Sequence, residues 1–195
     1  MPTITAQLVT SSGSVQDVPL TVGGTNAKGT AQGVGVSVTS EEVSGALHTV
    51  VLTLVNTPVT LVKNGTSTGG GGTAIYNFPQ GLITPLPGSS NLTVANALDK
   101  SFLASVGSAA AGTDGTLTST EISFLPSTAA TTSSGVGTCK MKATVTTPTP
   151  GAPLDGTSTP VVMYLNSCLN ADATGAEALT YSGTITIPYL HGGDN

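Results

Sequence analysis

The chain has 195 residues and a formal net charge of −5, and only 8% of its residues are charged. It contains no arginine, so the clustered basic side chains that bind nucleic-acid phosphates are missing and direct nucleic-acid binding is not expected. The length allows one domain with a substantial core, and the low charge with many β-branched residues excludes a chain that is disordered through charge repulsion.

Residues 1–24 are predicted to form an N-terminal arm or edge segment, with a single domain over residues 25–195. The segment joins the β-rich run ITAQLV at 4–9 to a polar spacer and then to VPLTVGG. An edge strand of the same domain and an arm that pairs with a neighbouring chain would have the same pattern. The arm interpretation predicts contacts beyond the domain by the apolar residues Ile4, Leu8, Val18 and Leu20.

The start of the chain has no basic region followed by a continuous apolar stretch, and the longest apolar run, at 47–55, is too short to cross a bilayer. We therefore expect a soluble protein that is made in the cytoplasm and does not contact a membrane.

Beyond the arm, apolar residues recur with a period of two, as in Val34, Val36 and Val38, and this periodicity predicts β-strands. Turn pairs such as Asn64-Gly65 and Asp114-Gly115 separate the runs. The whole pattern predicts an all-β protein, an antiparallel β-sandwich of jelly-roll type with very little helix. The expected strands cover 33–38, 48–55, 59–63, 74–78, 91–97, 101–107, 121–126, 139–146, 161–166 and 182–190.

A glycine-rich stretch, GTSTGGGG at 65–72, raises the question of a phosphate-binding loop. Such a loop needs a helix after the glycines and usually a following lysine, but here the β-rich TAIYNFP follows and Lys63 precedes. The four glycines are therefore predicted to form a flexible, surface-exposed connection between strands.

Groups for acid–base or nucleophilic catalysis are few. Only His48 and His191 could supply the base of a serine-type triad, and no G-x-S-x-G elbow is present, so both are predicted to be strand-edge or surface residues. Glu41 and Glu42 are adjacent and would face opposite ways on a strand, so they are predicted to lie in a turn. We expect no enzyme activity.

The two cysteines, Cys139 and Cys168, could pair, or could join the histidines in a metal site. No metal-binding spacing is present, and a reducing compartment favours buried, unpaired thiols, so no metal or other cofactor is expected. The aromatic residues Tyr76, Phe78, Tyr181 and Tyr189 are expected to pack in the core rather than to bind a ligand.

Four stretches in order, HTVVLTLVNTPVTL at 48–61, IYNFPQGLI at 75–83, DGTLTSTEISFLPSTAA at 114–130 and YSGTITIPYLHGGDN at 181–195, resemble the capsid decoration (cement) proteins of tailed bacteriophages. The resemblance runs from about Leu47 to the C-terminus, although the cysteines and the tetraglycine are not part of it. It implies a jelly-roll-like β-sandwich on the outer surface of the phage head.

The resemblance also implies a structural virion protein. Such a protein is made and assembled in the host cytoplasm, binds a major capsid protein with the HK97-type fold at junctions between capsomers, and stabilises the shell. A homotrimer is the expected assembly, with a dimer as the alternative. The competing hypothesis is an extracellular, fibre-type or adhesin-like β-sandwich that binds a receptor, and a Cys139–Cys168 disulfide would favour it.

Overall fold

The computed structural model describes residues 27–64, 68–96, 100–131, 136–141, 153–169 and 177–192, together with the backbone of two strands at 4–9 and 15–20. The protein is all-β, and every strand pairing is antiparallel. In the described ranges the helical content is one 3₁₀ turn, η1 (Ser119–Ile122), and no helix there is long and apolar enough to cross a membrane. The prediction of an all-β, antiparallel chain with very little helix is confirmed.

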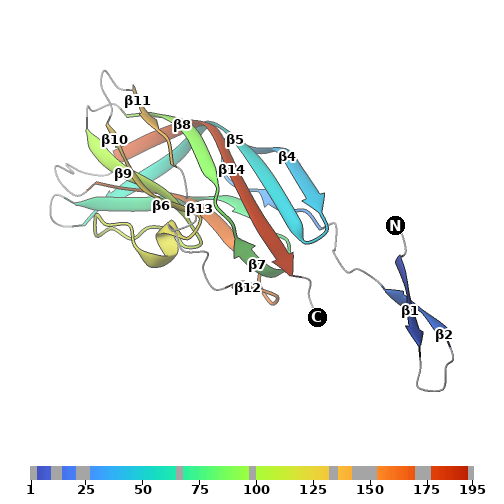
Figure 1. The fold of residues 1–195 in the computed structure, drawn as a ribbon. Coiled ribbons are helices and arrows are strands. Elements are labelled where there is room, and N and C mark those ends of the chain that lie inside the picture. Colours follow the sequence, from blue (N-terminus) through green and yellow to red (C-terminus); the bar gives the residue numbers. More distant parts are fainter. Residues whose placement is uncertain are drawn as a thin grey trace.

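The strands form two sheets of very different size (Figure 1). The smaller sheet contains β1 (Ile4–Val9) and β2 (Val15–Leu20). The larger has twelve strands: β3 (Thr30–Ala31), β4 (Val36–Ser44), β5 (Leu47–Lys63), β6 (Gly69–Asn77), β7 (Gly81–Pro85), β8 (Ser89–Ala95), β9 (Ser101–Gly107), β10 (Leu125–Thr131), β11 (Val136–Cys139), β12 (Leu154–Gly156), β13 (Val162–Leu169) and β14 (Glu177–Gly192).

The large sheet is strongly curled because its two longest strands pair with different neighbours along their lengths. Its main path runs β10-β9-β13-β6-β5-β14-β7-β12, while β4 pairs with β5, β3 with β6, and β8 with β14. β5 pairs with β14 over most of its length and reaches β6 only at Val62 and Lys63, where the chain turns back (Figure 1). The core fills the inside of this curl. Its largest fully buried side chains include Leu52, Leu54, Ile75, Phe78, Phe124 and Tyr181.

The four consecutive glycines are not an exposed loop, and that prediction is wrong. Gly69–Gly72 open strand β6, and Gly69, Gly70 and Gly71 are buried. A Cβ atom on Gly70 would lie 2.1 Å from the carbonyl oxygen of Gly112, and one on Gly71 would lie 2.1 Å from that of Thr60. The glycines are needed because backbone from two other segments approaches this strand closely.

Several strand boundaries also differ from expectation. The runs at 48–55 and 59–63 form the single strand β5, which continues through the bulge opposite Tyr181–Gly183. The run at 121–126 is not a strand, because η1 occupies its start and β10 begins at Leu125. The strands expected at 4–9 and 101–107 are found with those bounds. Residues 142–146 of the expected strand at 139–146 lie outside the described part.

The predicted arm residues lie in the β1–β2 hairpin. Its register places Ile4 opposite Leu20, Ala6 opposite Val18, and Leu8 opposite Gln16. Positions 4, 8, 18 and 20 therefore belong to the same alternating set of the two strands. The surroundings of their side chains lie outside the described residues, so their contact with a partner stays a prediction.

Candidate functional site

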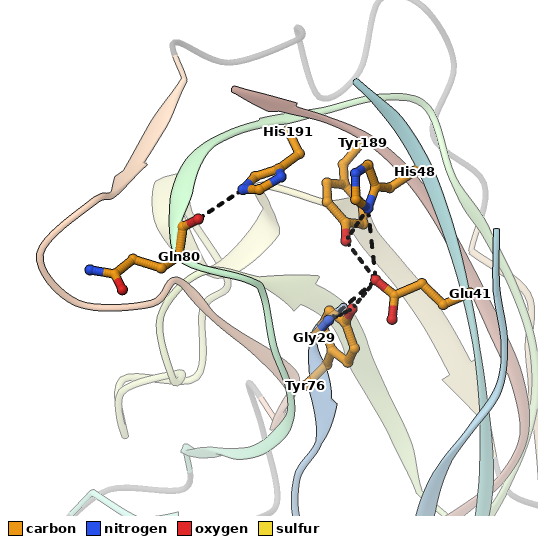
Figure 2. Close-up of polar contacts among 7 residues, drawn as sticks. All are labelled: Gly29, Glu41, His48, Tyr76, Gln80, Tyr189 and His191. Carbon is orange, nitrogen blue, oxygen red and sulfur yellow. Dashed lines mark hydrogen bonds and ion pairs between the residues drawn. The ribbon is translucent and has the colours of Figure 1, made fainter. Parts of the chain in front are cut away.

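Four strands bring a carboxylate, an imidazole and two phenol groups together inside the curl. Glu41 comes from β4, His48 from β5, Tyr76 from β6 and Tyr189 from β14, and their polar ends point toward one another (Figure 2). The sheet registers explain the meeting, because Tyr189 lies directly opposite His48 and Glu41 lies opposite Val50, two residues further along β5. Directly opposed residues and residues two apart share a sheet face, so this set faces inward.

The Glu41 carboxylate is the centre of the cluster. Its Oε1 accepts hydrogen bonds from the hydroxyls of Tyr76 and Tyr189, both at 2.9 Å, and from the backbone N–H of Gly29 at 3.2 Å. Its side chain is only 1% exposed. Three donors therefore point at one carboxylate oxygen that is out of contact with solvent.

The hydrogen bonds also determine how His48 is protonated. The Nδ1 atom of His48 lies 3.2 Å from the Tyr189 hydroxyl oxygen and 3.9 Å from Glu41 Oε1. The single hydroxyl proton of Tyr189 is donated to Glu41, so this oxygen accepts the Nδ1–H of His48. His48 Nε2 then carries a lone pair, and it is buried without a hydrogen-bond partner, as is Glu41 Oε2.

The surroundings keep the imidazole neutral and the phenols protonated. Burial lowers the pKa of His48, the nearby His191 lowers it further, and Glu41 opposes both effects. Burial raises the pKa values of Tyr76 and Tyr189 far above the ordinary tyrosine value. Both phenols therefore remain hydrogen-bond donors at neutral pH.

His191 lies beside this cluster and is anchored separately. Its ring centroid is 5.2 Å from that of His48 in an edge-on arrangement, and its Nε2 lies 2.8 Å from the backbone carbonyl oxygen of Gln80 (Figure 2). A carbonyl oxygen can only accept, so this contact requires a proton on Nε2 of His191.

The burial of Glu41, His48 and His191 corrects the predictions made for them. Glu41 is not in a turn, and neither histidine is at the surface, since His48 is 0% and His191 3% exposed. The alternation of the sequence could have placed both histidines inside. His48 is an even number of residues from Val50 and Leu52, and His191 is two residues from Tyr189, so each histidine shares the inward face of its strand with these apolar residues. No comparable signal existed for Glu41, because the register shift between Val38 and Ser40 breaks the alternation of β4.

The cluster has the groups of an acid–base site, but in this conformation they hold the fold together. The side chains of Glu41 and His48 have almost no contact with solvent. Their side-chain hydrogen bonds are to the tyrosine hydroxyls of β6 and β14. Within the described ranges, no three His, Cys, Asp or Glu side chains are grouped in a way that could hold a metal ion.

Both cysteines are unpaired and buried, Cys139 on β11 and Cys168 on β13. Burial raises the pKa of each thiol to about 11, so the thiols are protonated at neutral pH. The expectation that the tyrosines pack in the core is confirmed for Tyr76, Tyr181 and Tyr189, each of which is 0% exposed.

The outer face of the same sheet has a different character. Leu47 and Leu190 lie directly opposite each other on β5 and β14, and Leu82 on β7 lies opposite Gly192, two residues beyond Leu190. All three leucines point outward and are 39–42% exposed. We call these three residues the leucine patch. The outward positions that continue from it along β5 and β14 are uncharged: Thr49, Val51, Thr53, Thr184, Thr186 and Pro188.

Comparisons with protein-family models, curated proteins and solved structures found no match for this chain. The resemblance to phage decoration proteins therefore stays a prediction, and any functional argument depends on the surfaces and the cluster described above.

Proposed function

We propose that this chain is a non-enzymatic structural protein of a phage virion that binds the outer surface of the capsid at junctions between capsomers and stabilises the shell. Its partner is the major capsid protein with the HK97-type fold, and its own copies associate as a trimer. Assembly takes place in the host cytoplasm. A jelly-roll sandwich topology is the finer part of the same proposal.

The observation that carries the proposal is the uncharged outer face of β5 and β14 ending in the leucine patch. Cores of protein interfaces are depleted of charge and enriched in large apolar side chains, because such surfaces cost little to desolvate. Three outward leucines on neighbouring strands form a contiguous apolar surface of the kind that marks an interaction site. Glu41, His48 and His191 are, by contrast, enclosed in the core.

The adhesin-like alternative has no comparable support. A disulfide between Cys139 and Cys168 was the feature that would favour it, and both thiols are free in the structure. Free thiols suit assembly in a reducing compartment.

Binding to capsids of the phage that encodes this chain tests the proposal directly. We expect the purified protein to sediment with empty, mature capsids and to raise the temperature at which they disassemble. The double variant Leu47→Ser/Leu190→Ser should bind at least about tenfold more weakly, because each buried leucine contributes roughly 1.5–3 kcal/mol.

Val136→Ser is the matched control. This valine is 56% exposed and lies on β11, away from the leucine patch. It should leave capsid affinity unchanged. Failure of the wild-type protein to bind capsids would reject the function, whereas equal binding by the leucine variant would reject the leucine patch as the binding surface.

A further inference from the structure

The Glu41 cluster lies where the N-terminal arm joins the large sheet. Strand β3 has only two residues, which pair with Tyr76 and Asn77 of β6, and residues 27 and 28 before it are exposed. Gly29 lies between these exposed residues and strand β3. Its N–H contacts Glu41 Oε1 at 3.2 Å and the Tyr76 hydroxyl at 3.1 Å (Figure 2). These contacts fix the point at which the arm leaves the domain.

Only glycine fits at position 29. A Cβ atom there would lie 2.2 Å from both Cζ and the hydroxyl oxygen of Tyr76, much closer than any real side-chain contact. The Gly29 backbone therefore fills the space beside the phenol, and a side chain at this position would separate the two.

Protonation of His48 would disturb this arrangement. A proton can be added only at Nε2, which is buried and has no hydrogen-bond partner. The new positive charge would attract the Glu41 carboxylate, whose Oε1 lies 3.9 Å from Nδ1. Of the three bonds that Oε1 accepts, the one from Gly29 is the longest, so it is the weakest restraint on such a movement.

We propose that Gly29, Glu41, His48, Tyr76 and Tyr189 form an acid-sensitive latch. Protonation of His48 draws the Glu41 carboxylate away from Gly29 and releases the segment that carries the N-terminal arm. The groups that face His48 are Glu41 from β4 and Tyr189 and His191 from β14, and Tyr76 from β6 contacts the same Glu41 oxygen. His191 makes a positive charge on His48 less favourable in the closed state, because it lowers the pKa of that imidazole.

The direction of the pH effect follows from the chemistry of His48. In the closed state its pKa lies below the ordinary value of 6.5, so an opened imidazole binds a proton more readily than the closed one. The closed state therefore keeps its full stability above about pH 6.5 and loses stability as the pH falls below that value.

The latch is a property of the isolated chain and goes beyond the capsid proposal. Hydrogen–deuterium exchange of peptides covering residues 27–41 tests it without any capsid, at about pH 7.5 and about pH 5.5, with rates corrected for intrinsic exchange. In the wild-type protein we expect exchange in residues 27–31 to become faster at the lower pH, by up to about tenfold, because pH 5.5 lies about one unit below the ordinary histidine pKa. Peptides from β9 and β13 should keep their protection.

Three variants separate the latch from general acid sensitivity. His48→Gln keeps a polar side chain that cannot titrate, so exchange in residues 27–31 should no longer depend on pH. Gly29→Ala should exchange fast at both pH values, because its side chain displaces Tyr76. His191→Gln should open less at about pH 5.5 than the wild-type protein, since it removes a group that lowers the pKa of His48 in the closed state.

Equal protection of residues 27–31 at both pH values in the wild-type protein would overturn the latch, and so would an unchanged pH effect in His48→Gln. If His48→Gln does not fold, nuclear magnetic resonance titration of the wild-type imidazoles decides. The latch requires the opening midpoint to coincide with the titration of His48, and a midpoint that follows His191 instead would refute it.

Discussion

The two tyrosine hydroxyls in the Glu41 cluster make different hydrogen bonds. The Tyr76 hydroxyl donates to Glu41 and contacts the Gly29 N–H, whereas the Tyr189 hydroxyl donates to Glu41 and accepts from His48. Loss of either hydroxyl leaves buried polar atoms without partners, and unsatisfied buried groups cost more than the net value of a hydrogen bond. The two tyrosines therefore differ from the aromatic residues that only fill the core.

We predict that Tyr189→Phe lowers the free energy of unfolding by about 1–3 kcal/mol, because it deprives both Glu41 and His48 of a partner. Tyr76→Phe should cost less, since the Gly29 N–H keeps its bond to Glu41. Tyr164→Phe, which makes the same chemical change at a half-buried position on β13, is the control and should be nearly neutral. Chemical denaturation monitored by circular dichroism measures all three. Equal stability of Tyr189→Phe and Tyr164→Phe would contradict the role given to the cluster.

The cysteines give a second prediction at this scale. Cys139 and Cys168 are both 0% exposed, and each thiol pKa is raised to about 11. Because thiolate is the reactive species, the native protein should show almost no reaction with a thiol reagent at about pH 8, and two thiols should react after unfolding in denaturant. A non-reducing mass that is two hydrogens lower, or a thiol that reacts rapidly in the folded protein, would disprove this.

Among the strands, β6 shows how glycine serves packing rather than flexibility. The backbone of Gly112 approaches Gly70, and the backbone of Thr60 approaches Gly71. We predict that Gly71→Ala lowers the free energy of unfolding by about 1–3 kcal/mol or more, because a backbone carbonyl cannot move aside as a side chain can.

Gly112→Ala is the matched control for this strand. Among the described residues, the only atom within 4 Å of a Cβ atom at Gly112 would be Asp114 Oδ1, at 4.0 Å, so the variant should have wild-type stability. Thermal unfolding compares the two variants. A neutral Gly71→Ala would mean that β6 and β5 can separate locally at little cost.

The sequence predicted a strand well where its apolar residues alternate clearly, and poorly where they do not. Strands with clear alternation, such as β8 and the β5 segment containing Val50, Leu52 and Leu54, were predictable because one face is buried and the other is more exposed. Strand β6 was only half predicted, because four glycines have no side chains to alternate and their burial depends on segments distant in sequence. The short strands β3 and β12 have too few residues to show any period.

The site was less predictable than the strands. His48 and His191 could have been placed inside by their parity with neighbouring apolar residues, yet their meeting with Glu41 and Tyr76 depends on the pairing of four strands. A bulge in β4 and a curl in the sheet are tertiary features, and no local pattern encodes which inward side chains will touch.

For the whole molecule, the curl separates an enclosed polar cluster from the uncharged outward positions of β5 and β14, and the hairpin of β1 and β2 forms a second sheet. A two-stranded hairpin is marginally stable alone in water, so it gains stability if its apolar positions are covered by another surface. Ile4 and Leu20 are opposite each other in its register, and they belong to the same alternating set as Leu8 and Val18.

We predict that deletion of residues 2–22 leaves the large sheet folded but weakens binding to the capsid. Ordering the arm costs conformational entropy, and the buried apolar side chains offset it by roughly 1.5–3 kcal/mol each. Ile4→Ser/Leu20→Ser should weaken capsid binding as the deletion does, whereas Thr5→Ser/Gln7→Ser, in the other alternating set, should not. Circular dichroism checks the fold and capsid sedimentation the affinity. Unchanged affinity after the deletion, or loss of the fold, would show that the arm is not a docking element.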